Sequence, residues 1–201
     1  MVSSTYITNR WNLSGGRQRP QAIAWANEYS FTDGGLIVPE GTNEGQDFLI
    51  LSDHNRSEIN FAQQRIENKQ RMISGSMRSY HVADKLNISW SWEMLPSRAY
   101  SGDPEYDSNT GLVTNTGLTS FTVDGGAGGV DVVNWYENHQ GSFYMLLAYD
   151  RFDKFDSTQY QRFGQYNQVV EVLFSGFDYG VVKRGGSTHD FWNINVAVEE
   201  V

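Results

Sequence analysis

The stretch Leu86-Asn-Ile-Ser-Trp-Ser-Trp92 decides how this chain is expected to fold. Its large apolar side chains alternate with Asn and Ser, so Trp90 and Trp92 fall on one face of an extended strand and Ser89 and Ser91 on the other. A period of two is typical of a β-strand with one buried face. We therefore predict a strand whose tryptophan face packs into a core.

The same signals recur on both sides of this stretch. Residues 191–198 alternate in the same way, whereas residues 143–148 and 169–174 are more continuously apolar, as expected for strands covered on both faces. The complete set of predicted strands comprises residues 47–52, 64–80, 86–92, 118–123, 142–149, 167–175 and 191–198. The predicted fold class is mainly β, a β-sandwich or barrel.

One flanking α-helix is predicted over residues 130–140, with Gly141 as its stop signal. Its apolar face is formed, at helical spacing, by Val132, Trp135, Tyr136 and His139. The glycine-rich residues 124–129 precede it. Such a stretch can cradle phosphate at a helix start, but no Lys-Ser/Thr pair follows the glycines here. A flexible approach to the helix is the favoured interpretation.

The chain is expected to form a single β-sandwich domain over residues 46–201. Residues 1–45 mix turn signals with short apolar patches and are predicted to form an N-terminal arm packed on that core. Residues 64–95 are predicted to form a long β-hairpin, with residues 83–85 separating its two strands. Two extended loops are expected at residues 96–116 and 151–165, and loops of that length usually have a binding or assembly role.

Charge is distributed unevenly over the 201 residues. The chain has 15 basic and 24 acidic residues, a net charge of −9, yet residues 61–98 hold six basic residues against three acidic ones. Within this segment Arg65, Glu67, Lys69 and Arg71 recur at every second position, on one face of a strand. Three interpretations stay open: a solvated face that discourages edge aggregation, a joint between subunits, or a nucleic-acid contact, which is the least favoured because Glu67 interrupts the run of basic residues. The candidate joint residues are Arg65, Glu67, Lys69, Arg71, Arg78 and Lys85.

No catalytic, cofactor or metal site is predicted. The chain has no cysteine, which excludes disulfides, thiolate zinc sites and cysteine nucleophiles. Its four histidines are scattered and no G-x-S-x-G or H-E-x-x-H motif occurs. The aspartates of residues 150–156 lack the glycine and terminal glutamate of a calcium loop. An acidic chain is also a poor general binder of duplex DNA, and no apolar run is long enough for a membrane span.

Trp90 and Trp92 offer a second functional hypothesis. Exposed tryptophan rings can stack on sugars, which would make the chain a carbohydrate-binding β-sandwich module of a virion or a secreted protein. Their place beside Leu86 and Ile88 on the apolar face favours core packing instead. Exposure of the two indole rings discriminates between these hypotheses.

Three stretches carry a resemblance to a known family. These are Arg71-Met-Ile-Ser-Gly-Ser-Met-Arg-Ser-Tyr-His81, the run from Lys85 to Arg98, and Asp190-Phe-Trp-Asn-Ile-Asn-Val-Ala-Val-Glu-Glu-Val201. They resemble virion structural proteins of tailed bacteriophages, similar to the tail tube family and its tail-tip relatives. No catalytic residue is carried over by this resemblance.

The resemblance implies how such a protein works. It implies a β-sandwich protomer, made in the host bacterial cytoplasm, whose strands join those of neighbouring copies in a ring, commonly a hexamer, within the virion tail. Other tail proteins are the further partners, and DNA is only transient cargo in the lumen. A tail-tip, completion or connector role competes with that of the main tube subunit.

Overall fold

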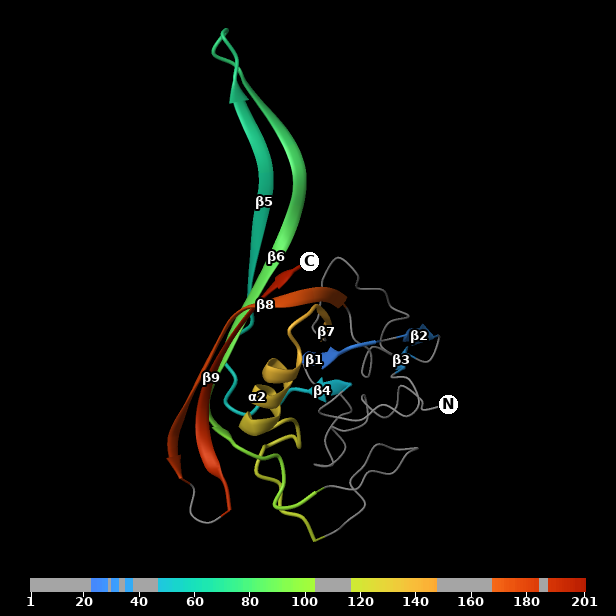
Figure 1. The fold of residues 1–201 in the computed structure, drawn as a ribbon, viewed down its shortest axis with the longest axis vertical. Coiled ribbons are helices and arrows are strands. Elements are labelled where there is room, and N and C mark those ends of the chain that lie inside the picture. Colours follow the sequence, from blue (N-terminus) through green and yellow to red (C-terminus); the bar gives the residue numbers. More distant parts are fainter. Residues whose placement is uncertain are drawn as a thin grey trace, which may run out of the picture.

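The computed structural model describes residues 23–28, 30–32, 35–37, 47–103, 117–147, 168–184 and 188–201. Its main element is an antiparallel sheet of seven strands in the order β4-β1-β7-β8-β9-β6-β5 (Figure 1). The strands are β1 (Ile23–Ala26), β4 (Phe48–Ile50), β5 (Asn60–Arg71), β6 (Met77–Pro96), β7 (Phe143–Leu147), β8 (Gln168–Arg184) and β9 (Asp190–Glu200). Strands β2 (Ser30–Thr32) and β3 (Gly35–Ile37) form a separate pair, and α2 (Gly129–Asn138) is a helix. The predicted fold class, mainly β with a long hairpin and a flanking helix, is confirmed.

The sheet bends over on itself, so that distant strands meet. Four strand spacings separate β1 from β6, which in a flat sheet would place them about 19 Å apart. Instead the ring centroids of Trp25 on β1 and Trp90 on β6 lie 6.1 Å apart. The segment after β4 then runs along β6, where the amide of Ser57 donates to the carbonyl of Ser91 and the indole nitrogen of Trp92 donates to the carbonyl of Ser52 at 2.7 Å.

The space enclosed by the bent sheet is filled with aromatic rings. Trp25 is completely buried and contacts Trp90, Trp135, Phe143 and Phe174, with centroid separations of 5.4–6.1 Å. These rings come from four strands and from α2, so burial of one indole holds several elements together. The tryptophan faces predicted from Leu86–Trp92 therefore do form the core.

A second buried cluster lies on the opposite face of β1, β4 and β7. Its members are Ala24, Ala26, Phe48, Ile50 and Leu146. Both faces of this part of the sheet are thus covered, as the continuously apolar sequence of residues 143–148 predicted.

The inner position of β1 corrects one prediction. Ile23–Ala26 is completely buried and pairs with both β4 and β7, so these four residues are part of the sheet and do not belong to an arm packed on it. Of the rest of the expected arm, β2 and β3 form the separate two-stranded pair, and residues 1–22 and 38–45 lie outside the described residues. Residues 104–116 and 151–165, from the two predicted loops, do so too.

Helix α2 matches its predicted position, and the glycine before it has a definite role. The backbone amide of Gly128 donates to Oδ2 of Asp131 at 2.9 Å, which caps the first turn. A Cβ atom at Gly128 would lie only 2.6 Å from the Cα of Arg98 and the carbonyl oxygen of Ser97. Glycine at this position therefore permits close packing against the chain at the end of β6. A segment that only gave flexibility before the helix, as predicted, would not require this.

The predicted strand over residues 118–123 is wrong. Only Ser120 forms an isolated bridge, with Tyr100, and the rest of this segment turns. The hydroxyl of Thr122 donates to the carbonyl of Gly126 at 3.0 Å, and Gly125 has a φ of +69°. These contacts fold the segment into a turn, which the apolar alternation alone did not reveal.

The turn of the long hairpin also differs from the prediction. Residues 83–85 continue the strand β6, and the chain reverses at residues 72–76. There the amide of Gly75 donates to the carbonyl of Met72 at 2.8 Å. The amide of Met72 donates to the carbonyl of Ser76, also at 2.8 Å. Gly75 has a φ of +85°, so this is a type I turn closed by a glycine bulge. The Ser-Gly-Ser sequence at 74–76 was the missed turn signal.

Replacing Trp25 by alanine is expected to lower the free energy of unfolding by about 3–5 kcal/mol, because the lost ring leaves a cavity among four others. Chemical denaturation monitored by circular dichroism measures this change. Ile73→Ala, at the exposed tip of the hairpin, is the matched control and should stay within about 0.5 kcal/mol of the parent. A similar small effect of Trp25→Ala would contradict the packing described.

Candidate assembly surface

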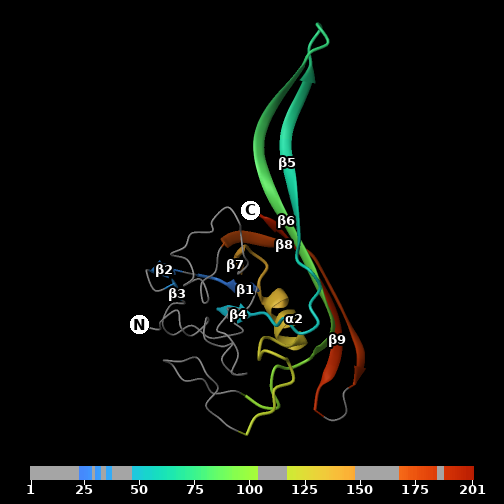
Figure 2. The same ribbon diagram turned by 180° about the vertical axis from the view of Figure 1, so that it is seen from behind.

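The distal part of the β5–β6 hairpin, residues 61–82, projects from the body as a two-stranded arm (Figures 1 and 2). All of its side chains are exposed except that of Glu67, which is half-buried. From Met77 to Leu86 the arm extends about 30 Å. A two-stranded ribbon without a covering layer is only marginally stable in water. This arm therefore gains little from its own fold.

Each face of the arm has its own chemistry, because paired residues in an antiparallel ribbon share a face. Phe61 pairs with Ile88, a core residue, so the face that contains Phe61 continues the core side of the sheet. Further out, this face holds Arg65, Glu67, Lys69 and Arg71 with their partners Asp84, His81, Ser79 and Met77. The predicted alternation of the four β5 charges is therefore present.

The other two candidate joint residues lie on the opposite face. Arg78 pairs with Gln70 and Lys85 with Gln64. The structure thus divides the six residues between the two faces of the arm and does not bring them into one patch. Sequence spacing could not show this, because Val82 is an extra residue in the pairing and interrupts the alternation of β6.

Most of the charged face is neutralised within the arm. Arg65 and His81 lie 3.1 Å and 3.0 Å from Asp84, and Glu67 pairs with Lys69 and accepts from the hydroxyl of Ser79 at 2.6 Å. Hydrogen bonds from Lys69 and then Ser79 lower the pKa of Glu67. Hydrogen bonds from His81 and then Arg65 lower the pKa of Asp84.

Two arginines of the arm have no such partner. Within the part of the chain that the structure describes, neither Arg71 nor Arg78 forms an ion pair. They belong to the two residue pairs next to the turn, Arg71 opposite Met77 and Arg78 opposite Gln70, and lie on opposite faces of the arm. The uncompensated positive charge of the arm is therefore concentrated near its tip.

The arm also exposes apolar side chains that sequence reasoning did not single out. Their exposed fractions range from 40% to full exposure, for Ile66, Met72, Ile73, Met77, Tyr80 and Val82. Single exposed apolar residues are ordinary, but this many on one projecting element suit an interaction site. An apolar residue in a strand sequence can be buried or exposed, so only the structure shows these to be exposed.

Two strands present backbone groups to possible neighbours. β5 is the last strand of the sheet, and β8 pairs with β7 only through residues 168–172. Among the described residues, the rest of β8 has a strand neighbour on the β9 side alone. Open edges such as these are templates for pairing with a further chain.

The tryptophan hypothesis for sugar binding is wrong. Trp90 and Trp92 are 3% and 1% exposed and pack edge to face with centroids 6.0 Å apart. Neither ring face is available to a sugar.

A serine, a histidine and an aspartate gather where the segment after β4 meets the turn before α2. The hydroxyl of Ser52 donates to Oδ1 of Asp124, and the amide of Asp53 donates to Oδ2, both at 2.7 Å. Burial lowers the pKa of His54, although the nearby charge of Asp124 opposes this shift. Because the Ser52 hydroxyl donates to the carboxylate and not to the imidazole, the geometry ties two segments together and does not activate a nucleophile.

The part of the chain that the structure describes offers neither a metal site of three ligands nor a membrane-spanning helix. No group of three or more His, Asp or Glu side chains in this part of the chain could hold a metal ion. Within the same ranges, no helix has the length and apolar character needed to cross a membrane.

Comparison with known proteins gives a likeness to solved structures. No protein-family model matches the chain, and no curated protein matches it either. Among solved structures, the chain is similar to one from the tail of an empty GTA particle, computed with helical refinement and C6 symmetry. The TM-score is 0.37 at 7% sequence identity, over 90% of this chain and 91% of the other.

Acid is expected to loosen the arm before the body unfolds. The pKa values of Glu67 and Asp84 are lowered in the fold from their ordinary values of 4.5 and 3.8. Above these ordinary values both carboxylates are charged, and their ion pairs stabilise the arm fully. This stabilisation is lost as the pH falls through the lowered pKa values and the carboxylates become protonated. Carboxyl NMR titration should give midpoints below those ordinary values. Midpoints at or above them would show that the pairs do not form in solution.

Proposed function

We propose that this chain is a structural subunit of a bacteriophage tail, a tail tube protein or a tube-like tail-tip or completion protein, that assembles into rings around a DNA conduit. The observation that carries this proposal is the projecting arm, which exposes apolar side chains on a ribbon too thin to bury them. A second layer of protein would supply the missing burial. The sequence resemblance of residues 71–81 and 85–98 to tail proteins points in the same direction.

The positions of the open edges favour rings over simple pairs. The edge of β5 and the unpaired side of β8 are different surfaces, so a contact between them in two copies would join unlike patches. Head-to-tail contacts of this kind close into rings when the rotation allows, or continue as filaments. We propose a hexameric ring of this chain, stacked on further rings or on other tail proteins.

The charge of the chain suits a conduit. A net charge of −9 repels a passing polyanion and does not hold it. In this proposal the six candidate residues of the β5–β6 hairpin form the joint between subunits, and the chain makes and breaks no covalent bond. It would act in the virion after synthesis in the host bacterial cytoplasm.

Shortening the arm is expected to abolish assembly and leave a folded monomer. Residues 65–84 would be replaced by Asn-Gly, a two-residue hairpin turn, which joins Gln64 directly to its pairing partner Lys85. The core residues of β6 begin beyond this junction, so the circular dichroism spectrum should be retained. Light scattering after gel filtration and negative-stain electron microscopy measure the assembly state.

Val123→Ser is the matched control for loss of exposed apolar surface, because Val123 is 70% exposed and lies outside the hairpin. This variant should assemble as the parent does. Rings or tubes formed by the shortened chain would overturn the proposal, as would a parent that stays monomeric at every concentration tested.

A further inference from the structure

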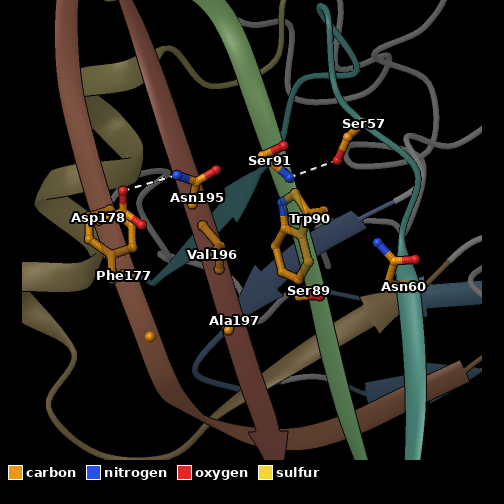
Figure 3. Close-up of a pocket in the computed structure, with 11 residues that line it drawn as sticks. Ser57, Asn60, Ser89, Trp90, Ser91, Phe177, Asp178, Asn195, Val196 and Ala197 are labelled. Atoms are coloured by element: carbon orange, nitrogen blue, oxygen red, sulfur yellow. Dashed lines mark hydrogen bonds between the residues drawn. The ribbon is translucent and has the colours of Figure 1, made fainter.

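A shallow groove crosses the face of the sheet that is turned away from the core. Its volume is about 340 Å³, and it lies over β6, β9 and β8 (Figure 3). Trp90, Phe177 and Val196 contribute to its lining, and the other lining residues are small or polar: Ser57, Asn60, Ser89, Ser91, Gly176, Asp178, Asn195 and Ala197. Asp178 is the charged member and accepts a hydrogen bond from Nδ2 of Asn195 at 2.9 Å.

The surroundings of the groove are acidic. Glu93, Glu171 and Glu199 are exposed on the same three strands. Residues 87–93, 171–180 and 193–199, which run through this surface, contain no lysine or arginine. The arm has the opposite charge, because residues 61–82 hold four basic side chains and one acidic one.

Glycines of β8 leave room on this face that the chain does not itself use. A Cβ atom at Gly176 would sit at an ordinary 3.5 Å from that of Ala197, and one at Gly180 would meet nothing within 4 Å. Neither residue has a positive φ, so the fold does not demand glycine at either place. A glycine inside a strand costs roughly 0.5–1 kcal/mol relative to alanine, and it often marks the close approach of another backbone.

We propose that this groove seats the arm of a second copy of the chain, with its Arg78 face turned toward Asp178. This rests on the proposed function, since it names the surface on which the arm docks. Charge complementarity selects the arm as occupant, because the unpaired Arg78 would meet a surface of carboxylates. Tyr80, 73% exposed on the Arg78 face, can cover the bare backbone at the glycines. The arm cannot reach the groove of its own chain, since it extends away from the body (Figure 1).

The absence of cysteine from the sequence allows a direct test by crosslinking. One protein would carry Gln70→Cys, on the Arg78 face of the arm, and a second, of different tag length, would carry Ser91→Cys in the groove. After mixing and mild oxidation, a disulfide-linked mixed dimer should form several-fold faster than with Val123→Cys, an exposed position elsewhere on the body. Disulfide formation requires the two Cβ atoms to approach within about 4.5 Å.

A charge exchange gives the second measurement. Asp178→Arg and Arg78→Asp should each raise several-fold the protein concentration needed for assembly, and a mixture of the two variants should assemble better than either alone. Glu137→Arg, the same charge change on helix α2, is the control. If the parent chain assembles but the crosslink is not selective, or the mixture of charge variants is not rescued, the groove is not the docking surface. The proposed function would still stand in that case. A parent that does not assemble would instead overturn both.

Discussion

The structure depends on one strand that belongs to two environments. β6 is 20 residues long, about 65 Å at the usual rise. Its second half buries Ile88, Trp90 and Trp92 in the core, and its first half forms one side of the arm. Because a strand is continuous and its pairing register is fixed, the buried indoles set the direction in which the exposed ribbon leaves the body.

This anchoring explains how an element with little stability of its own can persist. The core rings clamp the base of the arm, while the ion pair Arg65–Asp84 and the hydrogen bond from Ser79 to Glu67 join its two strands. Those charges neutralise each other, so they contribute less to attraction of a partner than the sequence suggested. The exposed apolar side chains and the two unpaired arginines are left as the features that a partner can recognise.

Alternation in the sequence was sufficient to predict the strands with one buried face. Trp90 and Trp92 signal β6, and Ile194 and Val196 signal β9, because water lies on one side of each strand and the core on the other. The helix was equally visible in the spacing of Trp135 and His139. These signals are local, so a single sequence contains them.

Features that depend on contacts between distant residues were not visible in this way. The turn at Gly75 was missed because apolar residues on both sides of it imitate a continuous strand. β1 was assigned to an arm because four residues are too few for a periodic signal, although Trp25 lies at the centre of the core. The groove joins residues from β6, β8 and β9, and no spacing along the chain indicates that they meet.

The central claim is that the arm becomes stably folded by docking on further protein. Hydrogen exchange of its backbone amides, residues 61–82, measured in dilute monomer and again in the concentrated, assembled protein, tests this most directly. We expect rapid exchange of these amides in the monomer and strong protection in the assembly, with the amides of β9 protected in both. Equal protection of the arm in the two states would contradict this claim.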